Sequence, residues 1–528
     1  MSFTATAKSL LRQIVCQCVW TGLTLMTLFG AAAAAAEPAS KPNIIFILAD
    51  DLGYGDLGCY GATKIKTPNL DRIAREGTRF TDAHSPSSVC TPTRYALLTG
   101  QYAWRHRPGA GILSGVAPLA IAPGTVTVPT LLKRAGYATG VVGKWHLGLG
   151  EGETDYNREI KPGPQEVGFD RVFILPATGD RTPCVYIEDR RVVGYDANDP
   201  IQVNYQQKIG NDPTGKENPE LLFNQKPSHG HDMTIVNGIS RIGWMTGGKA
   251  ARWVDEDMAD TFAKKAVTFI EQHRERPFFL YYSTHDAHVP RAPHPRFRGT
   301  SGHGLRGDCI QQLDGCVGEV LATLDRLKLA DNTLIIFTSD NGGVMDDGYQ
   351  DGTGDDASGH SCNGILRAKK GSLYEGGHRV PFVARWPDHV KAGATSGELL
   401  CHIDLLATCA AITGQPLPDS AGPDSFNALP ALLGKTKAAP GRDHLISHTG
   451  GFPGRLALRQ GPWKLIPPAG AAGANKNQNK KSEGGQAELY RLDDDLAESK
   501  NLASQHPDKV QELTERLATL REATRTRP

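Results

Sequence analysis

The sequence predicts an α/β protein with a large central sheet, mixed but mostly parallel and flanked by helices, and a small C-terminal α+β subdomain. Between residues 41 and 414, short apolar runs alternate with helical patterns, which is typical of α/β sheets. Several runs are apolar throughout, as expected for parallel strands buried on both faces. From about Gln415 the pattern changes to short strands and a final amphipathic helix.

Four continuous apolar runs are the predicted central strands, at residues 43–49, 138–143, 277–282 and 333–338. Each is followed by polar residues. In open α/β sheets, ligands bind beyond the carboxyl ends of the strands. We therefore predict one shared site, formed by Asp50 and Asp51, Lys144 and His146, His285 and His288, and Asp340 and Asn341.

The segments outside these strands are assigned by composition and periodicity. Residues 176–250 have little periodicity and many Gly, Pro and Asn, and we interpret them as an insertion beside the site. The large domain is expected to span residues 41–414.

The C-terminal subdomain is expected to span residues 415–528. Residues 463–466 and 488–492 are predicted strands, and the Ala/Gly/Asn/Lys-rich stretch 467–486 between them is predicted to be a mobile loop. Residues 507–521 are predicted to form a helix whose apolar face consists of Val510, Leu513, Leu517 and Leu520.

The composition excludes some classes of protein. Lys and Arg number 58 against 57 Asp and Glu, so there is no basic excess that would favour nucleic acid. Gly and Pro contribute 59 and 34 of the 528 residues, which indicates many turns and long loops.

Residues 1–36 resemble a secretory signal peptide. Lys8 and Arg12 precede an apolar stretch, and a run of alanines ends at Ala36. The alternative is an uncleaved membrane anchor, but the stretch is short for a span and Gln17 interrupts it. We expect cleavage, no stable membrane span afterwards, and export to the periplasm or the medium. The cysteines that remain show neither zinc-site nor dense disulfide spacing.

The segment Cys90-Thr-Pro-Thr-Arg94-Tyr-Ala-Leu-Leu-Thr-Gly100 is predicted to be a short helix. Pro92 suits the first turn and Gly100 suits the C-cap. Cys90 would then lie at the helix N-terminus, which favours anions, and Arg94 adds a positive charge one turn later. The alternative is a buried cysteine beside a capped helix.

Asp50, Asp51, Asp340 and Asn341 offer oxygen atoms at two strand ends. Adjacent carboxylates repel each other unless a cation lies between them. An all-oxygen set suits Ca²⁺ or Mg²⁺ rather than zinc. The alternative for Asp50 and Asp51 alone is a solvated acidic turn.

These motifs together resemble the type I sulfatases, formylglycine-dependent enzymes of the arylsulfatase family and the alkaline phosphatase superfamily. The Cys90–Gly100 segment is similar to the family signature, which implies that a maturase oxidises Cys90 to formylglycine. By that resemblance the aldehyde hydrates, one hydroxyl attacks sulfur, and the other expels the covalent sulfate. The resemblance also implies Asp50, Asp51, Asp340, Asn341 and the oxygen at position 90 as metal ligands, with Ca²⁺ expected and Mg²⁺ possible in its place.

The family resemblance also implies the cationic residues. Gly143-Lys144-Trp145-His146 is similar to the element whose lysine holds the diol and whose histidine takes its second proton. Residues 366–377 resemble the stretch that supplies a lysine to a sulfate oxygen; we assign Lys370, although Lys369 is adjacent.

The segment His285-Asp-Ala-His288-Val-Pro290 contains two candidate histidines. The family pattern places the catalytic one before x-Pro, which selects His288 as the acid that protonates the leaving alcohol. His285 is then expected to bind sulfate or to support His288.

The resemblance implies an exported sulfuric ester hydrolase that acts on a sulfated carbohydrate, or on an aryl sulfate. The alternatives are a phosphonate or phosphodiester hydrolase of the same superfamily, and an inactive relative that binds sulfated glycans. Departures from the family pattern are Thr93 and Gln101. Candidate contacts to the leaving group lie at 229–232, 241–249, His294 and His360.

Overall fold

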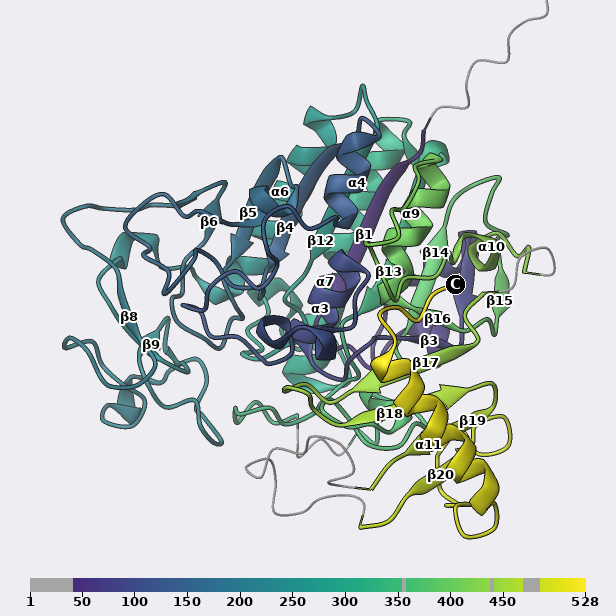
Figure 1. Ribbon diagram of the computed structural model, residues 1–528. Coiled ribbons are helices and arrows are strands. Elements are labelled where there is room, and N and C mark those ends of the chain that lie inside the picture. Colours follow the sequence, from purple (N-terminus) through teal and green to yellow (C-terminus); the bar gives the residue numbers. More distant parts are fainter. Residues whose placement is uncertain (1–40, 354–357, 437–440, 469–484) are drawn as a thin grey trace, which may run out of the picture. The chain divides into compact units, whose positions relative to one another are not determined.

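A sheet of ten strands forms the centre of the fold (Figure 1). The computed structural model describes residues 41–353, 358–436, 441–468 and 485–528. The predicted signal peptide and most of the predicted loop 467–486 lie outside these residues. The strand order is β15 (Ala394–Ser396), β2 (Thr78–Phe80), β14 (Phe382–Arg385), β13 (Thr333–Ser339), β1 (Asn43–Ala49), β12 (Phe278–Ser283), β4 (Ala138–Lys144), β5 (Arg171–Leu175), β6 (Ile187–Glu188) and β7 (Arg191–Val192).

The middle of this sheet is parallel, as the continuous apolar runs predict. Strands β13, β1, β12, β4 and β5 pair in parallel. Every residue of β1, β4, β12 and β13 is buried. Strand β14 is antiparallel to both neighbours, and β5, β6 and β7 pair antiparallel at the other edge. The predicted mixed, mostly parallel sheet is confirmed.

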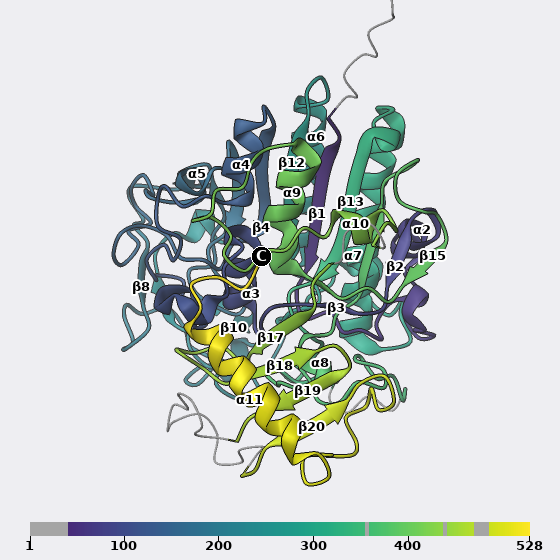
Figure 2. The ribbon, with the colours of Figure 1, turned by 45° about the vertical axis from the view of Figure 1, so that its right-hand side comes forward.

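Helices cover both faces of the sheet (Figures 1 and 2). Along β1, Ile44, Phe46 and Leu48 face one core, whereas Ile45 and Ile47 face the other, because side chains alternate along a strand. The first core is covered by α3 (Cys90–Thr99), α4 (Val128–Arg134) and α9 (Leu405–Thr413). The second is covered by α2 (Pro68–Glu76), α6 (Met258–Gln272) and α7 (Gly304–Arg326).

The residues interpreted as an insertion fold into short paired strands without a helical layer. Strand β8 (Gln202–Asn204) pairs with β11 (Trp244–Thr246), and β9 (Ile235–Val236) pairs with β10 (Ile239–Ser240). The remaining short elements are β3 (Ala83–His84), β16 (Leu400–Cys401), α5 (Pro164–Val167), α8 (Glu375–His378) and α10 (Leu429–Leu432).

A second, antiparallel sheet lies in the C-terminal part of the chain (Figure 2). Its order is β17 (His444–His448), β18 (Leu456–Gln460), β19 (Trp463–Ile466) and β20 (Glu488–Arg491). Helix α11 (Pro507–Glu522) packs Leu513, Leu517 and Leu520 onto this sheet, with Val510 half-buried beside them. The predicted strands and helix of this region are confirmed.

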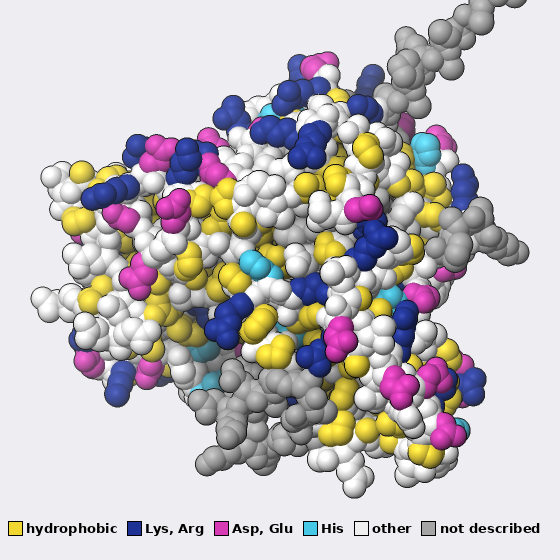
Figure 3. All heavy atoms as spheres, viewed as in Figure 1, with side chains coloured by type: hydrophobic (Ala, Val, Ile, Leu, Met, Phe, Trp, Pro, Cys, Tyr) yellow, Lys and Arg dark blue, Asp and Glu magenta, His cyan; other side chains and the backbone are white. Residues whose placement is uncertain are grey.

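The exposed face in Figure 3 carries acidic and basic side chains side by side, with neither sign dominating. This agrees with the balanced composition. None of the helices in the described part of the chain is both long and apolar enough to cross a membrane.

Candidate active site

The carboxyl ends of four central strands meet at one edge of the sheet. Strands β1 and β13 pair Ala49 with Ser339, and Asp340 N donates a hydrogen bond of 3.0 Å to Ala49 O. On the other side of β1, Asp50 N donates to Asp286 O at 3.1 Å. The polar residues that follow these strands are therefore held together by backbone hydrogen bonds.

Asp50, Asp51, Asp340 and Asn341 form a fully buried oxygen cluster. Asn341 Nδ2 donates to Asp51 Oδ1 at 2.7 Å, and Asp340 Oδ1 accepts from Asp51 N at 3.3 Å. Burial raises the pKa of Asp50, and the Asp340 charge raises it further. Burial also raises the pKa of Asp51. The cluster thus concentrates negative charge that its own surroundings do not fully neutralise.

Two atoms of this cluster indicate that it fits a cation. Asp50 Oδ1 and Asn341 Oδ1 are buried and have no hydrogen-bond partner, although buried acceptors are normally paired. Ligand-type atoms of Asp50, Asp51 and His288 lie within 4.8 Å of one another. Oxygen donors of this kind suit a hard divalent ion.

Arg94 is buried against Asp340. Its Nε and Nη2 donate to Asp340 Oδ2 at 3.1 and 2.7 Å. Its Nη1 donates to Lys144 O at 3.3 Å and also to Ser283 Oγ. Burial alone would raise the pKa of Asp340, but Arg94 and Lys144 outweigh it and lower that pKa.

Lys144 and Lys370 contact different carboxylates of the cluster. Lys144 Nζ donates to Asp50 Oδ2. Lys370 Nζ lies 2.8 Å from Asp51 Oδ2 and 2.8 Å from Asp347 Oδ2. Lys369 is exposed to solvent, so the structure brings Lys370 rather than its neighbour to the cluster.

Cys90 is the first residue of α3 and is 2% exposed. Gly100 ends the helix in a left-handed conformation with φ of 66°, as the sequence predicts. Burial raises the pKa of the Cys90 thiol more than Lys144 and Lys370 lower it. An unmodified Cys90 is therefore a protonated thiol at neutral pH and a poor nucleophile.

The backbone is strained at two site residues. Asp51 and His146 have φ of 58° and 52°, a conformation that non-glycine residues rarely adopt. His146 Nε2 donates to Leu113 O at 2.9 Å, which leaves its buried Nδ1 without a partner. Burial, Lys144 and Arg181 lower the pKa of His146 well below its ordinary value, so Nδ1 is an available acceptor.

The two histidines after β12 differ in what their ring nitrogens contact. His288 Nδ1 donates to Val289 O at 2.6 Å, and its Nε2 lies 3.7 Å from Asp51 Oδ2. His285 Nε2 instead accepts from Gly179 N at 3.0 Å. Burial lowers the pKa of His285 to about 3. Burial, Lys370 and Lys144 also lower the pKa of His288, so a positive His288 requires an anion beside it.

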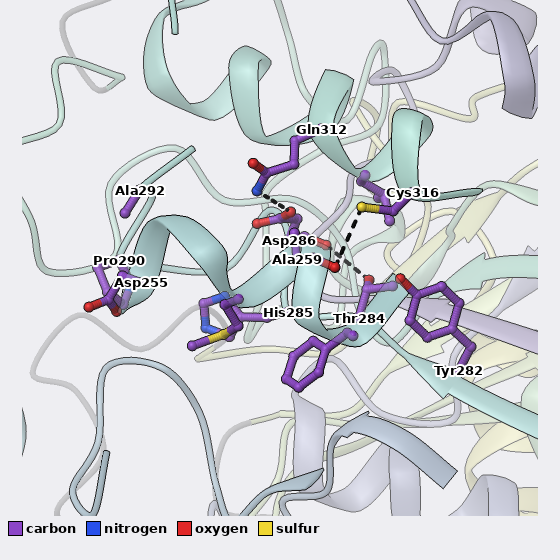
Figure 4. A pocket seen from close by; sticks show the side chains of 13 residues that line it. Asp255, Ala259, Tyr282, Thr284, His285, Asp286, Pro290, Ala292, Gln312 and Cys316 are labelled. Carbon is purple, nitrogen blue, oxygen red and sulfur yellow. Dashed lines mark hydrogen bonds between the residues drawn. The ribbon is translucent and has the colours of Figure 1, made fainter. Parts of the chain in front are cut away.

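Behind His285 lies a small cavity of about 20 Å³, lined by residues that include Asp286, Gln312 and Cys316 (Figure 4). Gln312 Nε2 points at Asp286 and donates to it at 3.0 Å. Burial raises the pKa of Asp286 to about 6. The cavity has room for one water molecule and is not lined by the oxygen cluster or Cys90.

Sequence analysis did not single out Asp347, Asp180 or Arg181. Arg181 Nη1 is buried without a hydrogen bond, 3.5 Å from Asp180 Oδ2. Burial lowers the pKa of Arg181, but Asp180 outweighs it and raises that pKa. These residues lie in loops without a repeating pattern, so local sequence offered no signal for them.

The candidate contacts to a leaving group differ in which residues they bond to. His231 Nε2 contacts Asp180 Oδ2 at 3.1 Å and so lies beside Arg181. Arg241 is fully buried against Asp255 at 2.7 Å, and His360 contacts the buried Asp56 at 2.8 Å. His294 accepts from Arg296 N at 3.4 Å. Stretch 241–249 also reaches this region, because Ile242 N donates to Asp180 O at 2.8 Å.

Comparisons with known proteins identify the family of this chain. A family model described as Sulfatase matches residues 42–415. The chain is 52% identical over 488 residues to N-acetylgalactosamine-6-O-sulfatase of Bacteroides thetaiotaomicron, covering 92% of this chain and 94% of that protein. It is 36% identical over 439 residues to human Arylsulfatase A, covering 82% and 76%.

A solved structure from work on glycosaminoglycan metabolism by Bacteroides thetaiotaomicron superposes with a TM-score of 0.87 at 51% identity. The alignment covers 92% of this chain and 100% of that one. The match of sequence and fold extends over both sheets, and the chain therefore belongs to the sulfatase family of enzymes.

Proposed function

We propose that this enzyme releases inorganic sulfate from a sulfated carbohydrate, and that its substrate carries a 6-O-sulfate on N-acetylgalactosamine. The observation that carries the reaction type is the meeting of buried Cys90, the cations Arg94, Lys144 and Lys370, and the four residues of the oxygen cluster at one edge of the sheet. The sugar is suggested by the name of the relative that is 52% identical over 92% of the chain.

Position 90 is proposed as the nucleophile. A formylglycine formed there by a maturase would supply a hydrated aldehyde, whereas the thiol of Cys90 is kept protonated by burial, which raises its pKa. Lys144 and Lys370 lie close enough for their charges to act on position 90. They would stabilise negative charge that develops there.

Asp50, Asp51, Asp340 and Asn341 are proposed to hold Ca²⁺, or alternatively Mg²⁺. Asp50 Oδ1 and Asn341 Oδ1 are the unpaired atoms that would turn to it. When bound, the ion would supply a Lewis acid that withdraws charge from oxygen at position 90 and from the sulfate.

The remaining steps are proposed for residues of the chain. Lys370 binds a sulfate oxygen, and Arg94 keeps Asp340 oriented while it adds positive charge. His288 donates a proton from Nε2 to the leaving oxygen once the sulfate beside it stabilises the imidazolium. His146 accepts a proton at Nδ1, the buried atom that has no partner.

The location and the domain organisation are proposals of the same kind. We propose that residues 1–36 direct export, so that the enzyme acts in the periplasm or outside the cell. We also propose that residues 41–414 form the catalytic domain and that residues 415–528 form a subdomain beside it.

The test combines chemistry at position 90 with sulfate release. The protein is produced with a formylglycine-generating maturase, digested, and the peptide containing position 90 is weighed after hydrazide trapping. We expect an aldehyde, and sulfate release from 6-sulfated N-acetylgalactosamine faster than from the 4-sulfated isomer. An unmodified thiol in a protein that still hydrolyses sulfate esters would disprove the proposed nucleophile. Preference for the 4-sulfated sugar or for phosphodiesters would disprove the proposed substrate.

A further inference from the structure

The segment that carries Lys370 is anchored by the C-terminal sheet. We define the Lys370 segment as residues 366–378. Arg367 Nη1 donates to Tyr490 Oη at 3.1 Å and to Glu498 O at 2.8 Å. Tyr374 Oη donates to Glu488 Oε2 at 2.7 Å. Apolar contacts join the same parts, in one cluster of Leu373, Tyr374, Ala457, Ile466, Tyr490 and Leu492.

Lys464 of β19 forms the centre of this anchor. Its side chain is 1% exposed, and its Nζ lies 2.8 Å from Glu375 Oε1 and 2.8 Å from Glu498 Oε1. It also lies 3.2 Å from His378 Nε2. Glu375 N donates to Glu498 Oε2 at 2.6 Å, which closes a ring between α8 and the C-terminal part. One buried ammonium thus donates a hydrogen bond to Glu375 and forms an ion pair with Glu498.

A chain of histidines continues from Lys464 into the large domain. His378 Nδ1 contacts His84 Nδ1 at 3.0 Å, and His84 Nε2 contacts Asp82 Oδ1 at 2.8 Å. His378 Nε2 also lies 3.1 Å from Leu373 O, a backbone acceptor within the Lys370 segment. His84, Glu375 and His378 resemble a metal-ligand set, but the Lys464 ammonium already supplies the cation.

The anchor lies a short distance along the chain from the reacting groups. Glu375 follows Lys370 by five residues. Between them Gly371 N donates to Ser88 O at 2.8 Å, and Ser88 N in turn donates to His448 O of β17 at 2.8 Å. Ser88 is two residues before Cys90. The C-terminal sheet therefore contacts both the Lys370 segment and the residues that lead into α3.

We infer that Lys464 is a positioning residue: by joining Glu375, Glu498 and His378 it fixes where Lys370 meets the sulfate. This inference rests on the proposed function, in which Lys370 binds a sulfate oxygen. Without the ammonium, two buried carboxylates would face each other across the gap, and repulsion would displace α8. Lys370 precedes α8 by five residues, in a stretch (366–374) that forms no helix, and would move with α8.

The test compares variants through constants that do not depend on the fraction of active enzyme. Lys464→Met removes the charge, and Glu498→Gln removes one partner charge at nearly constant shape. For each, KM for a sulfate ester and Ki for inorganic sulfate are measured, together with sulfate affinity by calorimetry. We expect both constants to rise together by about tenfold in Lys464→Met and by less in Glu498→Gln, since small misplacements of a binding group are costly.

Arg442→Met is the matched control. Arg442 is also a buried cation that joins the C-terminal part to the core. Its side chain is 1% exposed, and its Nη2 lies 2.5 Å from Asp404 Oδ1. Its guanidinium donates to Asp404, Tyr102, His444 and Asp424, which all lie outside the Lys370 segment. We expect it to lower Tm while KM and Ki stay within about twofold of wild type.

Unchanged KM and Ki in Lys464→Met and Glu498→Gln, with only a lower Tm as in Arg442→Met, would overturn the inference. Should Lys464→Met fail to fold, Glu498→Gln carries the same comparison. A wild type that hydrolyses no sulfate ester would overturn the proposed function instead. Calorimetric sulfate affinity would then still decide between the two roles of Lys464.

Discussion

Each cation of the site is already paired with a carboxylate. Lys144 contacts Asp50, Arg94 contacts Asp340, and Lys370 is shared between Asp51 and Asp347. A sulfate that binds here competes with these carboxylates for the same protons. A divalent ion held by the carboxylates would leave the lysines freer to bind the substrate, because opposite charges pair most strongly where water is excluded.

Lys370 and Lys369 form a matched pair for mutation. We expect Lys370→Met to lower kcat/KM by about 10²-fold to 10³-fold, the usual effect of losing one charge-stabilising group. Lys369 is exposed, and Lys369→Met should leave kcat/KM within about twofold of wild type, because exposed charges contribute little. Steady-state kinetics on one sulfate ester make the comparison, and equal losses in both variants would contradict the assignment.

His288 and His285 can be distinguished by the leaving group. If His288 donates the proton, His288→Asn should slow an alkyl sulfate much more than an activated aryl sulfate, whose leaving oxygen needs no proton. His285→Asn should show no such difference, since His285 Nε2 accepts from the Gly179 amide. The measurement is kcat on both esters for each variant. If His285→Asn rather than His288→Asn slows the alkyl sulfate selectively, His285 is the proton donor.

At the scale of elements, helix α2 is capped by a distant residue. Its own N-cap residue, Thr67, makes no side-chain capping bond. Asp314 of α7 instead accepts from Asn69 N at 3.0 Å and Leu70 N at 2.8 Å. Two donors that a helix start normally leaves unpaired are satisfied by tertiary packing.

We expect Asp314→Ala to lower the free energy of unfolding by about 2–3 kcal/mol, because buried N–H groups lose their acceptor. Denaturant titration measures this loss, and KM should not change. The control is Asp325→Ala on the same helix, whose carboxylate pairs with Arg72 but is 43% exposed. It should cost less than about 1 kcal/mol, and an equal loss in both variants would argue against capping.

For the whole molecule, the oxygen cluster links metal binding to stability. Ca²⁺ that binds the folded chain alone should stabilise it by about 2.7 kcal/mol at a hundred times its Kd. Chelation should therefore lower Tm, and Ca²⁺ should restore it, as scanning calorimetry can show.

Asp50→Asn provides the control for this linkage. Burial raises the pKa of Asp50, so ionising it without a cation costs stability, and the neutral amide avoids that cost. In the presence of a chelator, the Tm of the variant should equal or exceed that of the wild type, and added Ca²⁺ should change the Tm of the variant little. A wild type whose Tm ignores both chelator and Ca²⁺ would refute the proposed metal site.

Local sequence patterns predicted four central strands, the short helix that begins at Cys90, the C-terminal strands at 463–466 and 488–492, and the final helix. These depend on local hydrophobic periodicity, on Pro92 and on Gly100, and the structure agrees with them. It also indicated that polar residues after four strands would converge, because parallel strands share a carboxyl edge.

Tertiary structure alone decided which side chains reach that edge. The family pattern favoured Lys370 and His288, and packing shows the contacts they make: Lys370 meets Asp51 while Lys369 is exposed, and His288 rather than His285 turns a nitrogen towards Asp51. Asp347 and Arg181 had no sequence signal, because their partners lie on other loops and strands. A buried charge is placed by groups distant in sequence, as Lys464 is by Glu375, and local periodicity carries no record of such pairs.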